Sequence, residues 1–375
     1  MPMANYLSEV TGKEIVSLSI VFTVANGVGP ITMIAGGAIT KKIGPKMVVI
    51  LGGILFACGM IGSGFVKSVG LLVTTYGVLV GLGVGMVYGC TISNTIRFFP
   101  DKRGLIGGIA TASYGISSVL VPFAANMLID RVGVTASFKI IGIAMLIVIV
   151  IASAFIEKCP DGYAPAGYVG TAGGTKQIRE FSWSEMLKEP LFYLMLLVLC
   201  CCATSGMMII SQASPLAQRV LNITAGTAAS IVSTIALFNT IGRIIAGGIS
   251  DKLGPVVTIR CIFAGSIIGL ALMYVAVSGG AGICFYLGAY ITALMFGSIM
   301  GIYPGFTASQ FGPKNNGVNF GIMFIGFALA GLIGPTILSR LYVSTGNDST
   351  ALLLAMGLSA AGLLAAFVLS KFKKN

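Results

Sequence analysis

The sequence predicts an all-α integral membrane protein, and two observations support that prediction. Of its 375 residues, 56% are hydrophobic and only 9% are charged, whereas soluble globular domains carry about 25% charged residues. The apolar residues form runs of about 20 or more, which is the length that a helix needs to cross a bilayer. The apolar runs of a soluble α/β protein are shorter, so the composition argues against a soluble fold.

Eleven apolar spans are expected, five before a polar break and six after it. The first five lie near residues 15–40, 47–67, 70–97, 104–129 and 136–157. The break over 158–188 combines a Pro/Gly-rich loop with a short amphipathic helix, REFSWSEMLKEP, that carries the only tryptophan, Trp183. The last six spans lie near residues 190–214, 223–249, 256–277, 280–305, 317–342 and 350–371.

Basic residues lie in the connections between the spans. The net charge of +12 comes in part from KKIGPK at 41–46, DKRG at 101–104 and KFKK at 371–374. The positive-inside rule places these connections, the central loop and the C-terminus in the cytoplasm. Because the basic residues form no face with interleaved aromatic residues, we expect a lipid bilayer and not a nucleic acid as partner.

The two halves of the chain repeat each other. GAITKKIGP at 37–45 matches GGISDKLGP at 247–255, and FFPDKRGLIGG at 98–108 aligns with FGPKNNGVNFG at 311–321. Five N-terminal helices thus correspond to the last five C-terminal ones, and the counterpart of the span at 190–214 would precede residue 1. We therefore expect a fragment or a misassigned start that lacks the first transmembrane helix, in preference to an eleven-helix design.

The repeat and the break define three parts. We expect an N-terminal bundle of five helices over residues 1–157, a central cytoplasmic loop with a short amphipathic helix over 158–188, and a six-helix C-terminal bundle over 189–375.

Five motifs occur in order along residues 15–371. They are GLGVGMVYGCTISNTIRFFPDKRGLIGG, SWSEMLKEPLFYL, MMIISQASPLAQ, FNTIGRIIAGGISDKLGP and FGPKNNGVNFGIMF. Together they resemble the oxalate/formate antiporter family of the major facilitator superfamily, and more distantly the monocarboxylate transporters. The resemblance implies the major facilitator fold, in which two pseudo-symmetric bundles alternately expose a site at the membrane midplane. It implies no cofactor and no metal, and no constellation of catalytic residues suggests an enzyme.

The resemblance also implies that the two cytoplasmic turns act as gates. In the superfamily the acidic residue of the turn meets the positive N-terminal end of a helix in the opposite half, and Asp251 matches it. The matching position of the first turn is Lys41, which a helix N-terminus would repel. The other expected gating residues are Gly37, Gly44, Gly247, Lys252 and Gly254.

Arg243 is the expected anion-binding residue. An arginine near mid-helix costs about 2.5 to 3.5 kcal/mol on insertion scales unless it faces a cavity, a partner or the interface. A guanidinium donates two parallel hydrogen bonds to a carboxylate and keeps its charge. The resemblance agrees, because the oxalate carrier of the family uses an arginine of this helix. The alternative is that Arg243 snorkels about 12 Å toward the interface near Asp251 and only anchors the helix.

The residues near Arg243 favour a small monocarboxylate over oxalate. The second cation of the oxalate carrier, a lysine, corresponds to Phe327, and one cation neutralises a monocarboxylate but not a dianion. Asn239 replaces the aspartate of proton-linked carriers, and the chain has no histidine, so exchange is favoured over proton symport unless the absent helix supplies a proton carrier. The further wall candidates are Tyr88, Asn94, Tyr114, Ser211, Gln212 and Phe324.

The sequence therefore predicts a monomeric, multi-pass transporter in the cell membrane. It would move small organic anions, such as formate, by alternating access, with oxalate/formate-type exchange included. The alternatives are a carrier of another small solute, a proton-linked monocarboxylate carrier, and a truncated membrane protein that does not transport.

Overall fold

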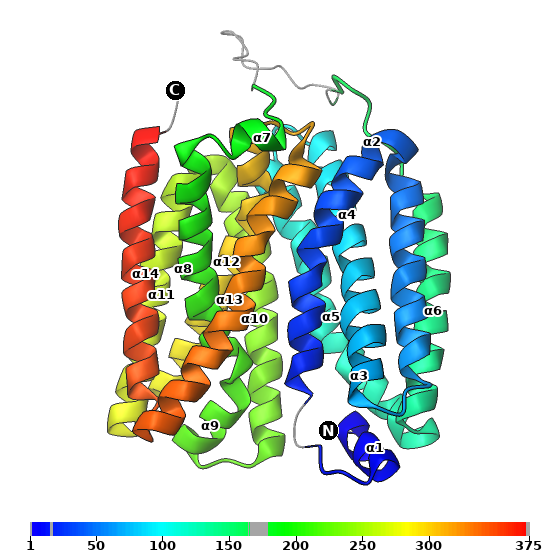
Figure 1. Cartoon of the computed structure of the whole chain (residues 1–375). Helices are drawn as coiled ribbons and strands as arrows, with labels where there is room; N and C mark the ends of the chain where they lie inside the picture. The colour runs from blue at the N-terminus through cyan, green and yellow to red at the C-terminus, as the bar shows by residue number, and fades with distance from the viewer. Residues whose placement is uncertain (1, 16–17, 164, 166–178, 373–375) are drawn as a thin grey trace. The chain divides into compact units, whose positions relative to one another are not determined.

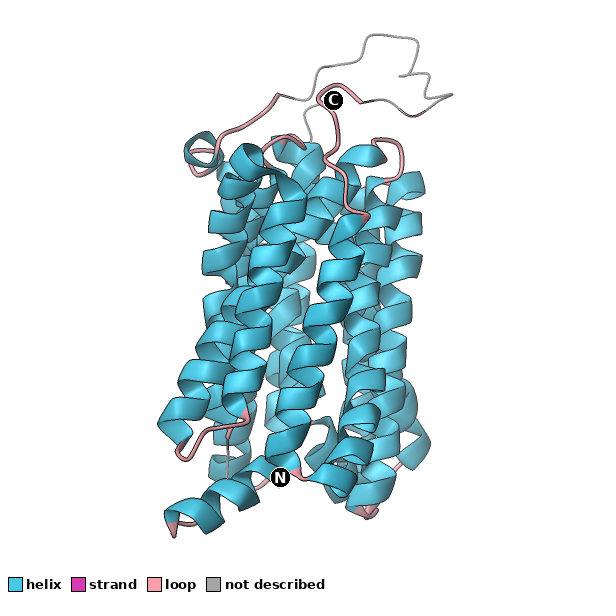
Figure 2. Ribbon diagram, turned by 90° about the vertical axis from the view of Figure 1, so that its right-hand side faces the viewer, coloured by secondary structure: helices cyan, strands magenta, loops and turns pink. Residues whose placement is uncertain are grey.

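The computed structural model describes residues 2–15, 18–163, 165 and 179–372, and every regular element within them is helical (Figures 1 and 2). In this described part, ten helices are long and apolar enough to cross a membrane. The longest, α2 (Ser19–Ser63), contains two of the expected spans, because its backbone leaves the helical region at Gly44. The described residues therefore contain about eleven spans, five before the central break and six after it. The Pro/Gly-rich part of that break falls largely on residues 164 and 166–178, which lie outside the described residues.

The helices follow the expected order. Before the break they are α1 (Pro2–Thr11), α2, α3 (Val69–Leu72), a π-helical segment (Val73–Val80), α4 (Gly81–Phe98), α5 (Arg103–Val132) and α6 (Val134–Ala154). After it they are α7 (Trp183–Met186), α8 (Pro190–Ser211), α9 (Ala213–Leu221), α10 (Ala225–Leu253), α11 (Pro255–Gly279), α12 (Gly282–Phe311), α13 (Asn316–Thr345), α14 (Ser349–Leu369) and a short 3₁₀ turn (Ser370–Phe372). The α3 helix, the π-helical segment and α4 form one continuous span.

The amphipathic helix expected over REFSWSEMLKEP is shorter than the sequence suggested. Only α7 is helical there, and Ser182 caps its N-terminus. Glu189 is extended because it precedes Pro190, which is the first residue of α8. The prediction of a helix was right in kind, but its length was overestimated.

The chain forms two compact units. The first contains Met1–Phe98, Leu120–Tyr163 and Lys314–Ala328, and the second contains Phe99–Val119, Ala164–Pro313 and Leu329–Asn375. The α5 and α13 helices each contribute one half to each unit. The bundle boundaries at residues 157 and 189 stay a prediction.

In the first unit, α2 packs against α4, α6 and the π-helical segment, and glycines allow close contact with α4 and with the π-helical segment. A Cβ atom at Gly83 would lie 2.5 Å from the backbone nitrogen of Phe56, and one at Gly59 would lie 2.7 Å from the carbonyl oxygen of Thr75. Because glycine has no side chain, the helix backbones approach closely at these two positions. Such close packing stabilises helix contacts in lipid, where the hydrophobic effect contributes little.

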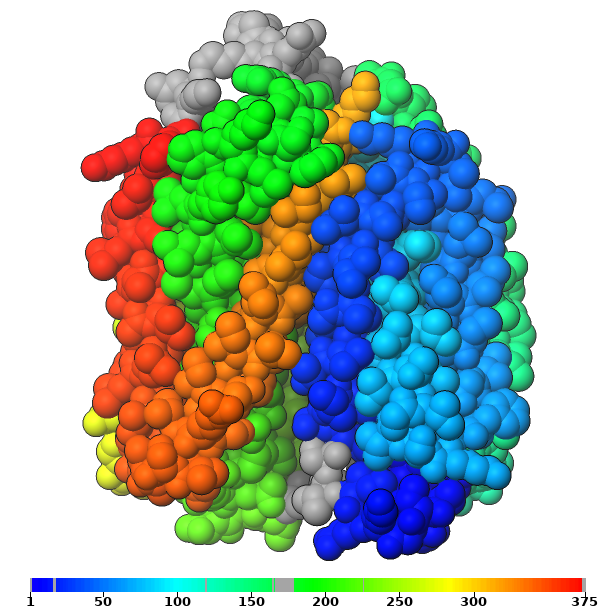
Figure 3. Space-filling model, viewed as in Figure 1, coloured from blue at the N-terminus to red at the C-terminus, as the bar shows by residue number. Residues whose placement is uncertain are grey.

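In the second unit, an apolar core joins α9, α10, α11, α12 and α14, with Leu216, Leu270 and Phe285 fully buried in it. The α8 and α14 helices lie side by side on the face that Figure 3 shows, α8 in green and α14 in red. The second half of α13 contacts α8, because a Cβ at Gly334 would lie 3.0 Å from the carbonyl oxygen of Thr204.

Two glycines that the repeat pairs adopt the same backbone conformation. Gly44 has φ 80° and ψ 162°, and Gly254 has φ 82° and ψ 152°. A proline follows each, which disfavours helical geometry in the preceding residue, and only glycine takes this positive φ without strain. The repeated Gly-Pro pair therefore ends one helix arm and starts the next in both halves of the chain.

Candidate functional site

Arg243 is buried in the middle of α10, with 9% of its surface exposed. Its Nε and Nη2 atoms donate to Oδ1 of Asn239 at 3.2 and 3.1 Å, and its Nη1 donates to the carbonyl oxygen of Thr111 at 2.7 Å. Asn239 lies one helical turn before Arg243, so the side chain points away from the Asp251 end of α10. If Arg243 snorkelled to the interface near Asp251, its side chain would have to point toward that end of α10 instead.

Asn239 is itself held in place. It is 8% exposed, and its Nδ2 donates to the carbonyl oxygen of Ala293 on α12 at 3.4 Å. Its amide oxygen thus receives the Nε–Nη2 edge of the guanidinium, as a carboxylate would, but without a negative charge. Asn239 orients Arg243 and does not titrate.

Glycines of α5 and α12 enclose the backbone of α10 at Arg243. A Cβ at Gly108 or at Gly301 would collide with the carbonyl oxygen of Arg243, and one at Gly297 would collide with that of Asn239. On the α5 side the contact continues in both directions. We call it the α5–α10 seam, and it consists of Gly104, Gly108 and Gly115 on α5 with Thr240, Arg243 and Gly247 on α10.

Asp251 closes one end of this seam. Its Oδ1 and Oδ2 accept hydrogen bonds from the backbone N–H groups of Gly104 and Leu105, both at 2.7 Å. These N–H groups belong to the first turn of α5, where no carbonyl of the helix can accept from them. A carboxylate there also interacts favourably with the positive end of the helix dipole. The neighbouring Lys252 is exposed.

The matching position of the first turn makes a different contact. Nζ of Lys41 donates to the side-chain Oδ1 of Asn315, the residue before α13. A Cβ at Gly37 would lie 2.6 Å from the backbone nitrogen of Val318 in α13. The repulsion expected between Lys41 and a helix N-terminus is thus avoided, because an uncharged amide oxygen accepts from the ammonium group.

Three of the predicted wall residues form one aromatic group in the first unit. The ring centroid of Phe324 lies 5.6 Å from that of Tyr88 and 4.7 Å from that of Phe327. All three side chains are half-buried. Tyr88 comes from α4 and the phenylalanines come from successive turns of α13.

The remaining wall candidates differ in their exposure and in their hydrogen-bond partners. Tyr114 is 49% exposed, and Gln212, at the junction of α8 and α9, donates to Oγ of Ser339 at 3.5 Å. Ser211 donates to the backbone of its own helix. Asn94 donates to the carbonyl oxygen of Glu157 at 2.8 Å, so it holds the chain that follows α6.

Sequence reasoning missed Thr111 and the two glycines on α12. The contact of Thr111 uses a main-chain oxygen, which leaves no signal in the sequence. Gly297 and Gly301 do follow the small-xxx-small pattern of close helix contacts, so their role was readable.

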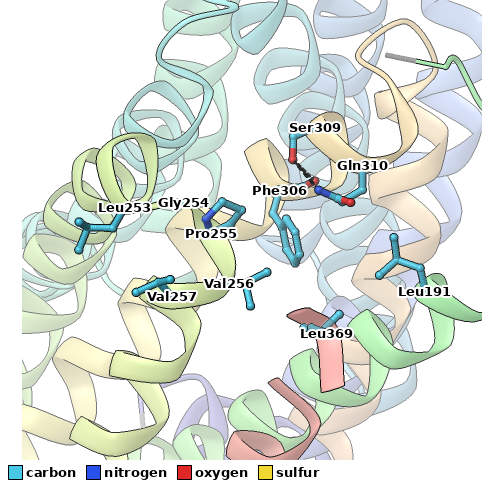
Figure 4. A pocket seen from close by; sticks show the side chains of 10 residues that line it. All are labelled: Leu191, Leu253, Gly254, Pro255, Val256, Val257, Phe306, Ser309, Gln310 and Leu369. Carbon is cyan, nitrogen blue, oxygen red and sulfur yellow. Dashed lines mark hydrogen bonds between the residues drawn. The ribbon is translucent and has the colours of Figure 1, made fainter. Parts of the chain in front are cut away.

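A cavity of about 230 Å³ lies elsewhere in the second unit, at the turn between α10 and α11 (Figure 4). Of the predicted residues only Gly254 lines it, and none of its lining residues is charged. The lining consists of Leu191, Leu253, Gly254, Pro255, Val256, Val257, Phe306, Ser309, Gln310 and Leu369. It therefore offers an anion no charged side chain. Nor do the described residues contain three or more His, Cys, Asp or Glu side chains grouped to hold a metal.

Comparisons with known proteins agree with this architecture. A sequence profile of the Major Facilitator Superfamily matches residues 1–335. The oxalate:formate antiporter of Oxalobacter formigenes is 28% identical over 373 residues, which cover 98% of this chain and 86% of the antiporter. An uncharacterized MFS-type transporter of Escherichia coli strain K12, YhjX, is 28% identical over 300 residues, or 79% of this chain and 72% of YhjX.

Among solved structures, the fucose:proton symporter FucP of E. coli superposes with a TM-score of 0.69. The match covers 100% of this chain and 93% of the symporter, at 14% sequence identity. At this identity the likeness concerns the fold alone.

Proposed function

The chain belongs to the Major Facilitator Superfamily, and from this premise we propose that it exchanges small monocarboxylates such as formate by alternating access. The family and the fold are those of a multi-pass membrane transporter, not of an enzyme. The observation that carries the proposal is the buried, oriented guanidinium of Arg243 in the middle of α10.

Burial and orientation both favour a role in binding. An arginine inside a spanning helix is costly and marks a substrate or ion pathway more often than a packing position. Asn239 and Thr111 restrict the guanidinium without taking its charge, since both acceptors are neutral oxygens. A carboxylate can therefore gain a charge-assisted bidentate contact there.

The proposed cargo follows from the residues around the cation. The position of the second cation of the oxalate carrier is Phe327, which packs on Phe324. A single cation neutralises a monocarboxylate and leaves one charge of oxalate uncompensated in a low-dielectric site. The related oxalate:formate antiporter supports a small carboxylate as cargo.

Exchange is favoured over proton symport. Asn239, which cannot release a proton, occupies the position next to Arg243, and the chain contains no histidine. We further propose that the protein is a monomer in the cell membrane with its central loop and C-terminus in the cytoplasm. In this scheme Asp251 and Lys41, with the glycines of their turns, gate the cytoplasmic side.

Counterflow in proteoliposomes tests the proposal. Vesicles loaded with formate, oxalate, lactate or pyruvate are offered the labelled anion outside. Native protein should exchange a monocarboxylate faster than oxalate, and Arg243→Gln should lower exchange about 10- to 150-fold, because a hydrogen bond to a charged group contributes about 1.5 to 3 kcal/mol. Arg243→Lys, which keeps the charge but loses the planar fork, should fall between the two.

Arg260→Gln is the matched control, because it removes a positive charge from the neighbouring helix α11. Arg260 stacks on Phe367 and donates to the carbonyl oxygen of Ala366, away from the proposed site. Exchange should survive this change. Unchanged carboxylate exchange in a correctly inserted Arg243→Gln protein would contradict the proposed function and favour a neutral cargo.

A further inference from the structure

Arg243 ties α10 to α5 by a hydrogen bond to a main-chain oxygen. Thr111, whose carbonyl accepts from Nη1 at 2.7 Å, is fully buried in the half of α5 that belongs to the second unit. Inside a helix that carbonyl also serves the N–H group four residues later. The bond from Arg243 is therefore an additional one on the second lone pair, and the helix does not need it.

The same two helices are tied again at Asp251, eight residues further along α10. Between the two ties the backbones touch, since a Cβ at Gly104 would lie 2.6 Å from the carbonyl oxygen of Gly247. A polar contact thus lies at each end of a stretch in which glycines bring the two backbones together. Releasing one of these ties therefore weakens the contact between the two helices.

An anion at Arg243 competes with one of these ties. The hydrogen bonds of Arg243 to Asn239 and Thr111 engage all three nitrogens of the guanidinium. Asn239 belongs to α10 and moves with Arg243, whereas Thr111 belongs to another helix. A carboxylate that binds along the Nη1–Nη2 edge takes over Nη1, because its charge-assisted hydrogen bond is about twice as strong as one to a neutral carbonyl.

The corresponding contact in the first unit has no such cation. A Cβ at Gly321 on α13 would lie 3.1 Å from the carbonyl carbon of Met33 on α2, as Gly108 faces the carbonyl of Arg243 in the α5–α10 seam. Met33 precedes Arg243 by 210 residues, the separation of Gly37 and Gly247 in the repeat. A thioether has no charge to offer a carboxylate, so an anion can act directly on only one of these two paired contacts.

We infer that the carbonyl of Thr111 positions Arg243 in the absence of cargo and competes with the cargo for it, so that carboxylate binding loosens the α5–α10 seam. This inference rests on the proposed anion-binding role of Arg243. Substrate binding thus replaces one interhelical hydrogen bond, from Arg243 to Thr111, by a hydrogen bond from Arg243 to the substrate.

Amide hydrogen exchange of the full chain in lipid nanodiscs tests the inference. The probes are formate, acetate and pyruvate at saturation, with chloride as reference. Amides from Gly104 to Tyr114 should exchange about 2- to 12-fold faster with a bound carboxylate, which is the effect of losing one ordinary hydrogen bond. Amides from Gly317 to Phe327, at the contact with Met33, should not accelerate.

A pair of adjacent substitutions separates the seam from general loosening. A Cβ at Gly247 would collide with the carbonyl of Gly104, whereas one at Gly248 would make only an ordinary contact with Leu105, at 3.7 Å. In the Gly247→Ala variant, the amide hydrogens at the start of α5 should exchange fast even without an anion. Adding a carboxylate should change their exchange rate little. Gly248→Ala should behave like the native protein.

Binding is measured separately, as the rise in thermal unfolding temperature that each carboxylate causes. A carboxylate that stabilises the protein but leaves exchange in α5 unchanged or slower overturns the inference while the carrier function stands. If no carboxylate binds, the proposed function fails and the inference fails with it.

Discussion

At the scale of single residues, the position of Arg243 depends on residues that have no side chain. Gly297 and Gly301 lie one turn apart on α12, and each allows the backbone of α10 to approach where a Cβ would collide with a carbonyl oxygen. The amide of Asn239 then reaches Ala293 on the same helix. The direction of the guanidinium is thus set by the distance between two helix backbones.

Gly297→Ala should displace Asn239 and Arg243 together. Overpacking of a closely fitted contact costs about 1 to 3 kcal/mol, so we expect a lower unfolding temperature in detergent and weaker carboxylate binding. Gly357→Ala is the control, because no atom lies within 4 Å of its Cβ position on α14. That variant should be as stable as the native protein or more so, since alanine favours a helix. Equal stability of both variants would contradict the close approach at Gly297.

At the scale of elements, the four-residue helix α7 has a capping box at its N-terminus. The N–H of Ser182 donates to Oε2 of Glu185 at 2.8 Å, and the hydroxyl of Ser182 accepts from the N–H of Glu185 at 3.4 Å. The preceding residue, Phe181, is fixed to α12 by a backbone hydrogen bond to Phe311 at 3.0 Å and by an edge-to-face ring contact. These contacts, rather than helix length, hold α7 in place.

The capping box predicts a pH dependence of α7. The backbone N–H of Ser182, then its hydroxyl and then Arg179 lower the pKa of Glu185 from 4.5 to about 2. A lowered pKa means that the ionised carboxylate stabilises the cap above about pH 4.5, and that this stabilisation is lost as pH falls toward 2. Trp183, the only tryptophan, lies inside α7 and reports on it.

Fluorescence of Trp183 should therefore stay constant from pH 7 to 5 and change on further acidification. Glu185→Gln should abolish the step and resemble the acid form of the native protein at neutral pH. Glu189→Gln, at the next carboxylate along the chain, should keep it. A step that persists in Glu185→Gln would assign the titration to another group.

At the scale of the whole molecule, the two halves of the internal repeat place matching residues at matching contacts, but the charges of these residues differ. Asp251 and Lys41 occupy matching positions, and each reaches the beginning of a helix from the other half of the repeat. Asp251 accepts two backbone N–H groups of α5, whereas Lys41 donates to one side chain, Asn315. Only the first of these contacts gains from the helix dipole.

Replacing the two residues should therefore have unequal effects. Asp251→Asn should weaken the contact with α5 by about 1 kcal/mol and speed amide exchange at Gly104 and Leu105 about fivefold, because the dipole interaction needs the charge. Lys41→Met should change exchange at the start of α13 by less than about twofold, since an exposed contact of this kind contributes little. Both are measured on the anion-free protein. Effects of equal size would show that the two contacts are equivalent.

Much of the architecture was readable from the sequence because the bilayer acts on each segment separately. A span needs enough apolar residues to cross the membrane, and the Gly-Pro pairs at Gly44 and Gly254 restrict their own backbone. Hence the order of the spans, the kink in α2 and the break at α7 were predictable from local composition. The same local reasoning drew attention to Arg243, since a charge in an apolar run is costly wherever its neighbours lie, and its role in anion binding stays a prediction.

The partners of these residues were not predictable in that way. No pattern in the sequence indicates that Arg243 donates to the carbonyl of Thr111, that Lys41 meets Asn315, or that Asn94 holds the chain after α6. Hydrogen-bond partners depend on which backbones approach each other, and that approach depends on glycines scattered over several helices. Because lipid solvates each segment, the sequence by itself determines the spanning helices and the position of the charged residue within one of them. The contacts of that charge depend on how the helices pack in three dimensions.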